Sequence, residues 1–246
     1  MEYMARLHTY SQHFLRSPRL VAELIGHSNI RKNDTVYDLG AGSGVIASVL
    51  AGRCKQVVAV EIEPKALQTL RNNLGHVDNV TILSQDITTL PLPDTPYKVF
   101  SNIPFNLSAS IVRKLTQATN PPRSIYLIAQ KQFARKLVPG DDHFTSQLSA
   151  EIAPWFTARI RKPLRKTDFT PPPAVDTVLL EIKPRENPLV HSSHAAMYRT
   201  FIKKCFEHQT TFQATDRAGA NVSPEKRPSQ LSTDEWLRLF AISTEV

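Results

Sequence analysis

Short apolar runs alternate with amphipathic stretches between about residue 18 and residue 130. The runs predict buried strands at 35–39, 56–60, 80–83, 97–101 and 124–129. The amphipathic stretches predict helices at 45–53, 65–74 and 107–118, and Pro64 stands at the first position of the second helix, where proline is favourable. Strands that alternate with helices predict βαβ units and a parallel sheet.

The pattern changes after residue 150. A basic stretch at 159–166 and the prolines at 171–173 precede an apolar, β-branched run at 175–182, which predicts one more strand. Beyond residue 183 the strand pattern stops, and 194–207 and 233–241 have helical periodicity. We therefore expect an α/β, Rossmann-like, mostly parallel sheet in residues 1–183 and a small helical domain in residues 184–246.

Charge and cysteine content narrow the choice of partner and compartment. The 246 residues carry a net charge of +8, which favours a polyanion such as nucleic acid or an anionic membrane, although a basic surface without a partner would look the same. Cys54 and Cys205 lie far apart and form no metal-ligand cluster, so a reduced, cytoplasmic chain without a metal is expected. No apolar run reaches the ~18 residues of a membrane span, and the first 14 residues lack the apolar core of a signal peptide.

A glycine-rich loop follows the first predicted strand. Gly40, Gly42 and Gly44 form a Gly-x-Gly-x-Gly turn between a strand and a helix, where glycines allow positive φ and close approach of a ligand. Ligands of open α/β sheets bind beyond the carboxyl ends of the strands. A dinucleotide site and a simple tight turn would both fit the loop taken alone.

Two carboxylates sharpen this interpretation. Glu61 ends the second strand, 21 residues beyond Gly40, where it can accept hydrogen bonds from ribose hydroxyls. Asp86 follows the third strand and is placed to bind the exocyclic amino group of an adenine. An NAD site would share the loop and the first acid, but nothing downstream resembles a nicotinamide pocket, so a nucleoside cofactor beside a base pocket is favoured.

The segment 101–105, Ser-Asn-Ile-Pro-Phe, follows the fourth strand and suggests the chemistry. Methyl transfer to an adenine N6 needs that nitrogen's lone pair, which is delocalised into the ring. The Asn102 side-chain oxygen and a main-chain carbonyl near Ile103 or Pro104 could accept both N6 hydrogens and favour a tetrahedral nitrogen. Phe105 offers a face for a flipped-out base, and no strong general base is needed because positioning supplies most of the rate. A proline loop with a core phenylalanine is the plainer alternative.

Together these segments resemble the ribosomal RNA adenine N6-dimethyltransferases over nearly the whole chain. The carrying segments are 10–15 (YSQHFL), 38–44 (DLGAGSG), 60–62 (VEI), 85–87 (QDI), 102–105 (NIPF), 130–134 (QKQFA) and 169–176 (FTPPPAVD). The resemblance implies a class I fold that binds S-adenosylmethionine.

The resemblance also implies roles for single residues. Cofactor contacts are implied at His13, Leu15, Gly40, Gly42, Glu61, Asp86 and Asn102. Base stacking is implied for Phe105, with Phe169 on the other side. This chain departs from the family's usual Asn at His13, its usual Glu at Asp38 and its frequent Tyr at Phe105.

Two branches of the family are possible for this chain. The erythromycin-resistance (Erm) type dimethylates an adenine of 23S rRNA and gives resistance to macrolides, lincosamides and streptogramin B, whereas the housekeeping type modifies two adjacent adenines of 16S rRNA. The Asn-Ile-Pro-Phe motif, the C-terminal segments at 228–232 and 235–237 and the short chain favour the Erm type. A monomer is expected.

A basic cluster provides the predicted RNA contacts, since five of the eight residues from 159 to 166 are positive. We expect these side chains to neutralise backbone phosphates: Arg159, Arg161, Lys162, Arg165 and Lys166. Solvated surface charge is the alternative. Two other functions stay open at this point: a DNA adenine methyltransferase, and a binding protein that uses the fold without catalysis.

Overall fold

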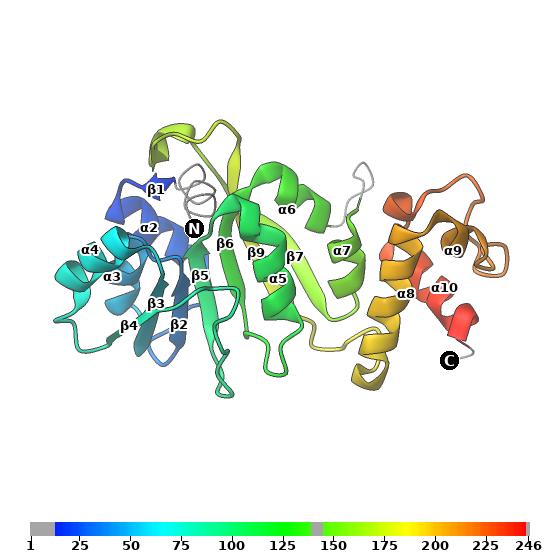
Figure 1. Cartoon of the computed structure of the whole chain (residues 1–246), viewed down its shortest axis with the longest axis horizontal. Helices are drawn as coiled ribbons and strands as arrows, with labels where there is room; N and C mark the ends of the chain where they lie inside the picture. The colour runs from blue at the N-terminus through cyan, green and yellow to red at the C-terminus, as the bar shows by residue number, and fades with distance from the viewer. Residues whose placement is uncertain (1–12, 139–144, 245–246) are drawn as a thin grey trace. The chain divides into compact units, whose positions relative to one another are not determined.

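The computed structural model describes residues 13–138 and 145–244 (Figure 1). Its strands are β1 (Phe14–Leu15), β2 (Thr35–Leu39), β3 (Gln56–Glu61), β4 (Val80–Ser84), β5 (Lys98–Asn102), β6 (Ile125–Gln130), β7 (Phe156–Leu164), β8 (Phe169–Thr170) and β9 (Thr177–Pro184). Its α-helices are α2 (Pro18–Gly26), α3 (Val45–Ala51), α4 (Pro64–Leu74), α5 (Ser108–Thr116), α6 (Lys131–Leu137), α7 (Gln147–Ile152), α8 (Ala195–Glu207), α9 (Gln209–Gln213) and α10 (Thr233–Thr244).

Seven strands form the central sheet in the order β4-β3-β2-β5-β6-β9-β7. The pairs β3–β4, β2–β3, β2–β5 and β5–β6 are parallel, and β9 is antiparallel to β6. The order reverses between β2 and β5, which opens a crevice at their carboxyl ends where open α/β sheets bind ligands. The predicted Rossmann-like, mostly parallel sheet with a helical C-terminal part is confirmed.

Local sequence explains how the first βαβ units form. Glu63 caps α4 by accepting a hydrogen bond from the Ala66 N–H at 2.6 Å, and Pro64 occupies the first helical turn as predicted. Helices α2 and α3 pack together, and their apolar side chains join those of β2 and β3 in one buried cluster. This packing holds the strand ends that carry the glycine loop and Glu61.

The basic stretch is part of a strand, which the sequence pattern did not predict. Strand β7 contains Arg159, Arg161 and Lys162, together with Pro163, near one edge of the sheet. Proline lacks the N–H that a central strand needs, and the edge tolerates this loss. Few side chains of β7 are fully buried, and its sequence has no continuous apolar run that would have predicted a strand.

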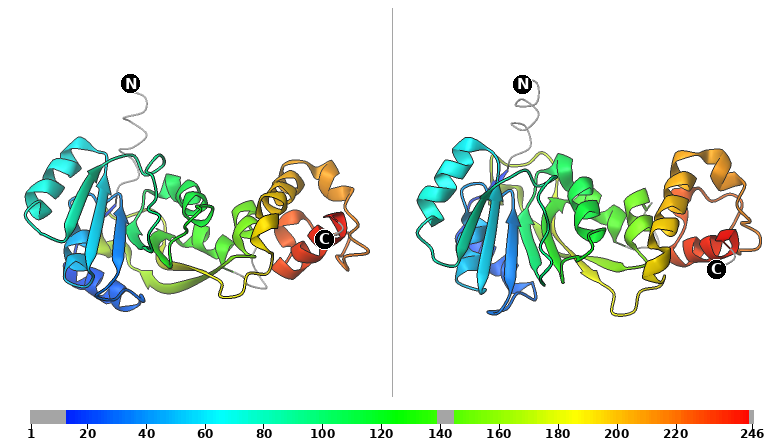
Figure 2. Two further views of the ribbon diagram at one scale, coloured as in Figure 1. Left: turned by 90° about the horizontal axis from the view of Figure 1, so that it is seen from below. Right: turned by 60° about the horizontal axis from the view of Figure 1, so that its bottom comes forward.

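The chain divides into two compact units, 1–134 with 159–183, and 135–158 with 184–246. The two expected domains, 1–183 and 184–246, stay a prediction, and the segment 135–158 groups with the C-terminal helices and not with the sheet. The reason is packing: Ala150 and Trp155 join the buried cluster formed by Tyr198 and Trp236. Helices α8, α9 and α10 gather around this cluster (Figure 2).

Candidate active site

The glycine loop joins β2 to α3 with three left-handed residues. Gly40, Gly42 and Gly44 have φ values of 76°, 57° and 91°, a region that strains other residues. The Gly40 and Ala41 N–H groups donate to the Val60 carbonyl at 2.8 and 2.9 Å, so the loop is tied to the end of β3. A Cβ on Gly42 would lie 3.0 Å from the Phe14 ring, which therefore packs directly on the loop.

Glu61, at the end of β3, is held by backbone donors. One carboxylate oxygen accepts from the Gly42 N–H at 2.8 Å. The other accepts from the Ile62 and Glu63 N–H groups, both at 2.8 Å. The carboxylate is therefore oriented by the fold itself, and its remaining lone pairs are available to ribose hydroxyls.

Asp38 lies beneath the same loop and is fully buried. Neither of its carboxyl oxygens makes a hydrogen bond of normal geometry with the described residues. Burial raises the pKa of Asp38 to about 8, the charge of Glu61 adds to the rise, and the backbone of Ala47 offsets it only in part. A pKa raised in this way favours the neutral acid at pH 7.

Asp86 follows β4 and also lines the cavity. One of its carboxylate oxygens accepts from both the N–H and the hydroxyl of Thr88, each at 2.7 Å. This turn fixes the side chain beside Ile87 at the cavity wall.

Asn102, at the end of β5, has its amide orientation set by a neighbour. The Asn102 Nδ2 donates to the main-chain oxygen of His13 at 2.6 Å. Because a carbonyl can only accept, the NH₂ group must face it and Oδ1 must face the other way. Oδ1 is buried and has no hydrogen-bond partner among the described residues. A buried acceptor of this kind carries a cost of about 1–3 kcal/mol until a donor reaches it.

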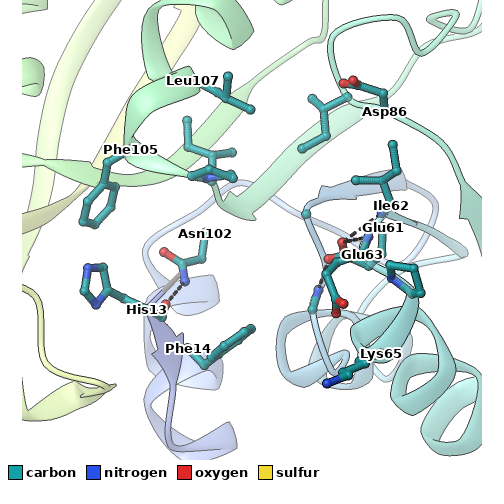
Figure 3. Close-up of a pocket in the computed structure, with 16 residues that line it drawn as sticks. His13, Phe14, Glu61, Ile62, Glu63, Lys65, Asp86, Asn102, Phe105 and Leu107 are labelled. Atoms are coloured by element: carbon teal, nitrogen blue, oxygen red, sulfur yellow. Dashed lines mark hydrogen bonds between the residues drawn. The ribbon is translucent and has the colours of Figure 1, made fainter. Parts of the chain in front are cut away.

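Two rings stack beside Asn102. Phe105 follows Pro104 and begins a 3₁₀ turn, and its ring lies 5.6 Å from the His13 imidazole at an angle of 29°. The His13 Nδ1 lies 2.8 Å from the Pro171 carbonyl oxygen. Figure 3 shows His13, Asn102 and Phe105 grouped at one end of the cavity and Glu61 and Asp86 at the other.

These groups line one cavity of about 600 Å³, a volume typical of small-molecule sites. Nine of the residues predicted for the site line it: His13, Gly40, Gly42, Glu61, Asp86, Asn102, Ile103, Pro104 and Phe105. The structure thus brings together segments that are up to 92 residues apart, from His13 to Phe105.

Leu15 and Phe169 do not line this cavity, although Leu15 lines a small pocket of about 30 Å³ that shares Phe14, Gly40 and Asn102 with it. They pair across the two-stranded sheet β1–β8, and both side chains belong to the buried core. Phe169 is fully buried, so its ring presents no open face to a base, contrary to the expectation of stacking from the other side. The Phe169 ring belongs to the buried cluster that also contains Leu15 and the apolar side chains of α2.

Several lining residues were missed by the sequence interpretation. Phe14, Ile62, Lys65 and Leu107 border the cavity, and Ser101 lies behind it, where its hydroxyl accepts from the Leu39 N–H at 2.7 Å. Ile62 is 51% exposed directly after Glu61, and an apolar residue next to a strand-end acid is the signal that would have found it.

The basic cluster is largely paired within the chain. Arg159 and Lys183 contact the buried Glu181, and Arg161 lies 3.9 Å from it. Lys162 pairs with Glu23. Arg165 pairs with Asp168 at 3.2 Å but stays 83% exposed, and Lys166 donates to the Ala174 carbonyl. Among these side chains, exposure favours Arg165, the 58% exposed Arg159 and the exposed Lys166 as groups that can meet a phosphate.

Comparison with known proteins decides the family. The model of the ribosomal RNA adenine dimethylase family matches residues 5–227. The chain belongs to this family. It is 27% identical to an rRNA adenine N-6-methyltransferase of Bacillus anthracis over 95% of this chain and 86% of that protein.

Two further relatives bear on the branch. A mitochondrial ribosomal RNA small subunit methyltransferase of Arabidopsis thaliana is 32% identical over 79% of this chain, which spans only 52% of that longer protein. The crystal structure of the 23S rRNA methyltransferase ErmE superposes with a TM-score of 0.79 at 25% identity, covering 94% of this chain and 100% of that one. The predicted family and its likeness to the Erm branch are confirmed.

As a member of this family the chain is an enzyme that uses S-adenosylmethionine. The lining of the cavity is compatible with such a nucleoside: the glycine loop lets a ligand approach the backbone, and Glu61 and Asp86 place carboxylates, which can accept hydrogen bonds from hydroxyl and amino groups, at the cavity wall. No cluster of three metal-ligating side chains occurs in residues 13–138 and 145–244. None of the helices described is long and apolar enough to span a membrane.

Proposed function

We propose that this enzyme dimethylates N6 of one adenine in 23S rRNA and so gives resistance to macrolide, lincosamide and streptogramin B antibiotics. The observation that carries the chemistry is the Asn102 Oδ1, a buried acceptor at the cavity wall that lacks a hydrogen-bond partner among the described residues. An adenine amino group is a donor of the right kind to satisfy it.

Asn102 and Phe105 together would hold the base. Phe105 stacks on the flipped adenine while Asn102 Oδ1 accepts one N6 hydrogen, and the main chain near Ile103 or Pro104 accepts the other. Both bonds favour the tetrahedral nitrogen that carries a usable lone pair. S-adenosylmethionine, held between the glycine loop, Glu61 and Asp86, would supply an electrophilic methyl group on sulfur, and Asn102 and Phe105 would hold N6 in line with it.

The cofactor end of the cavity would orient the donor. Glu61 accepts from the ribose hydroxyls, Asp86 faces the adenine amino group, and the glycine loop and Phe14 border the remaining space. These contacts fix the reacting atoms relative to one another, which supplies most of the rate in the absence of a general base.

The preference for 23S rRNA rests on the Asn-Ile-Pro-Phe motif and on the likeness to ErmE across 94% of the chain. The small-subunit enzyme is the second candidate, favoured by the 32% identity to the Arabidopsis protein. Both candidates share the cavity and differ only in the RNA that reaches it.

RNA binding would use exposed cations. We infer that Arg159 and Arg165 meet backbone phosphates, because they keep most of their exposure beside their ion-pair partners. The exposed Lys166 would add a third charge, whereas Arg161 and Lys162 face acidic partners within the chain and are mostly covered, so they would contribute less. The helical domain 184–246 is proposed as a second RNA contact; that the enzyme is a cytoplasmic monomer stays a prediction.

Methyl transfer to protein-free 23S and 16S rRNA in parallel, with the modified nucleotide mapped by primer extension, tests the proposal. A label on one 23S adenine supports it, and expression in a sensitive host should then raise macrolide tolerance. A label on two adjacent 16S adenines would instead assign the enzyme to the housekeeping branch. Labelling of neither RNA would refute both candidates.

A further inference from the structure

His13 and Phe14 are adjacent in the chain but serve different ends of the cavity. Phe14 packs against Gly42 of the glycine loop, on the cofactor side. The His13 ring stacks on Phe105 beside Asn102, on the base side (Figure 3). His13 directly precedes β1, and successive side chains of extended backbone point to opposite sides.

The His13 ring is anchored rather than loose. Its Nδ1 faces the Pro171 carbonyl at 2.8 Å, and because that oxygen can only accept, Nδ1 carries the hydrogen. Pro171 directly follows β8, which pairs with β1. The ring is therefore held from behind by the two-stranded sheet and from the front by Phe105.

The spacing of the two rings limits where a base can stack. Their centroids lie 5.6 Å apart, whereas a base inserted between two rings needs two stacking distances, roughly 7 Å. His13 thus covers one face of Phe105, and an adenine can stack only on the other.

We propose that His13 is a positioning residue for the target adenine: it locks the Phe105 ring and leaves a single face for the base, while the neighbouring Phe14 serves the cofactor. The inference rests on the proposed adenine methylation. It moves His13 from the cofactor contact implied by the family resemblance to the base side of the site. The main-chain oxygen of His13 accepts from Asn102 Nδ2, so a change of the His13 side chain leaves this hydrogen-bond acceptor in place.

The test compares His13→Ala and His13→Phe with Phe14→Leu, using S-adenosylmethionine and the rRNA that the wild-type enzyme accepts. We expect His13→Ala to lower kcat/KM for RNA about 3- to 10-fold, the value of one aromatic pair, with calorimetric affinity for S-adenosylmethionine within twofold. His13→Phe, which keeps the stack, should recover most of the loss. Phe14→Leu should do the reverse, weakening cofactor affinity and sparing the KM for RNA.

A double variant separates positioning from a general structural effect. If His13 acts through Phe105, adding His13→Ala to Phe105→Ala costs nothing further, whereas independent effects multiply. Loss of cofactor affinity in His13→Ala, wild-type kinetics in that variant, or multiplied losses in the double variant would each overturn the proposal. If the wild-type enzyme methylates neither rRNA, the proposed function itself fails and this inference falls with it.

Discussion

The two ends of the cavity differ in how complete they are before any ligand binds. At the cofactor end, Glu61 already accepts three backbone hydrogen bonds, and the glycine loop is tied to β3. At the base end, Asn102 Oδ1 is buried without a partner among the described residues. The carboxylate that faces the cofactor is therefore held by the backbone, although the buried Asp38 beneath the loop lacks a hydrogen-bond partner among the described residues, whereas the acceptor at the base end still lacks a donor.

This difference suggests how specificity and catalysis are divided. Backbone-held carboxylates cost nothing to reorganise and suit a cofactor that is common to many enzymes. An unsatisfied acceptor discriminates strongly between substrates, because only a ligand with a correctly placed donor offsets the free-energy cost of its desolvation. We therefore expect changes at the base end to act on turnover and changes at the cofactor end to act on cofactor affinity.

Asn102→Ala should give the largest effect. Removing the acceptor should lower kcat by about 10²- to 10³-fold, the usual loss for one preorganised polar group. Affinity for S-adenosylmethionine should fall only a few-fold, because Glu61 and the glycine loop remain in place. Single-turnover methylation and calorimetry measure the two quantities, and wild-type turnover in this variant would remove Asn102 from the chemistry.

Phe105→Ala should have the next largest effect. Loss of base stacking should cost about 1–3 kcal/mol in kcat/KM for RNA and leave cofactor affinity unchanged. Phe105→Tyr is the matched control, since it keeps the ring face and should retain nearly full activity. Equal losses in both variants would mean that stacking is not what Phe105 provides.

Much of the sheet and of the cofactor end could be predicted from sequence because the signals are local. An apolar run predicts a strand, and a glycine turn with a strand-end acid predicts a nucleoside site, as at Gly40 and Glu61. Strand β7 was not predicted, because basic side chains interrupt its apolar positions and it lies near the sheet edge.

The base end was harder to predict because it depends on contacts distant in sequence. The orientation of Asn102 comes from the His13 carbonyl, 89 residues away, and the His13 ring is set by Pro171. Phe169 stands in a family motif, yet its pairing with Leu15 buries it completely. Only the assembled fold distinguishes a ring that lines a cavity from one that supports it.

Asp38→Asn probes the buried acid beneath the glycine loop. With the pKa of Asp38 raised to about 8, the folded protein holds a proton that the unfolded chain releases above its ordinary pKa of about 4. Wild-type stability therefore falls as pH rises from 5 to 7, by about 1.4 kcal/mol per unit from this group. Asparagine cannot ionise, so the variant should lose this slope. Denaturant unfolding of the cofactor-free proteins at three pH values measures it, and parallel slopes would contradict the buried neutral acid.

Arg165→Ala should have the smallest effect and should be confined to RNA binding. Arg165 is 83% exposed and lies outside the cavity, so its loss should raise the KM for RNA a few-fold and leave kcat and cofactor affinity unchanged. If it meets one phosphate, the slope of log affinity against log salt should fall by about 0.7–0.9. Lys162→Ala is the control, because Lys162 pairs with Glu23 and is mostly covered. An unchanged salt slope for Arg165→Ala would assign this charge to the solvated surface, and RNA affinity would then have to come from other cations.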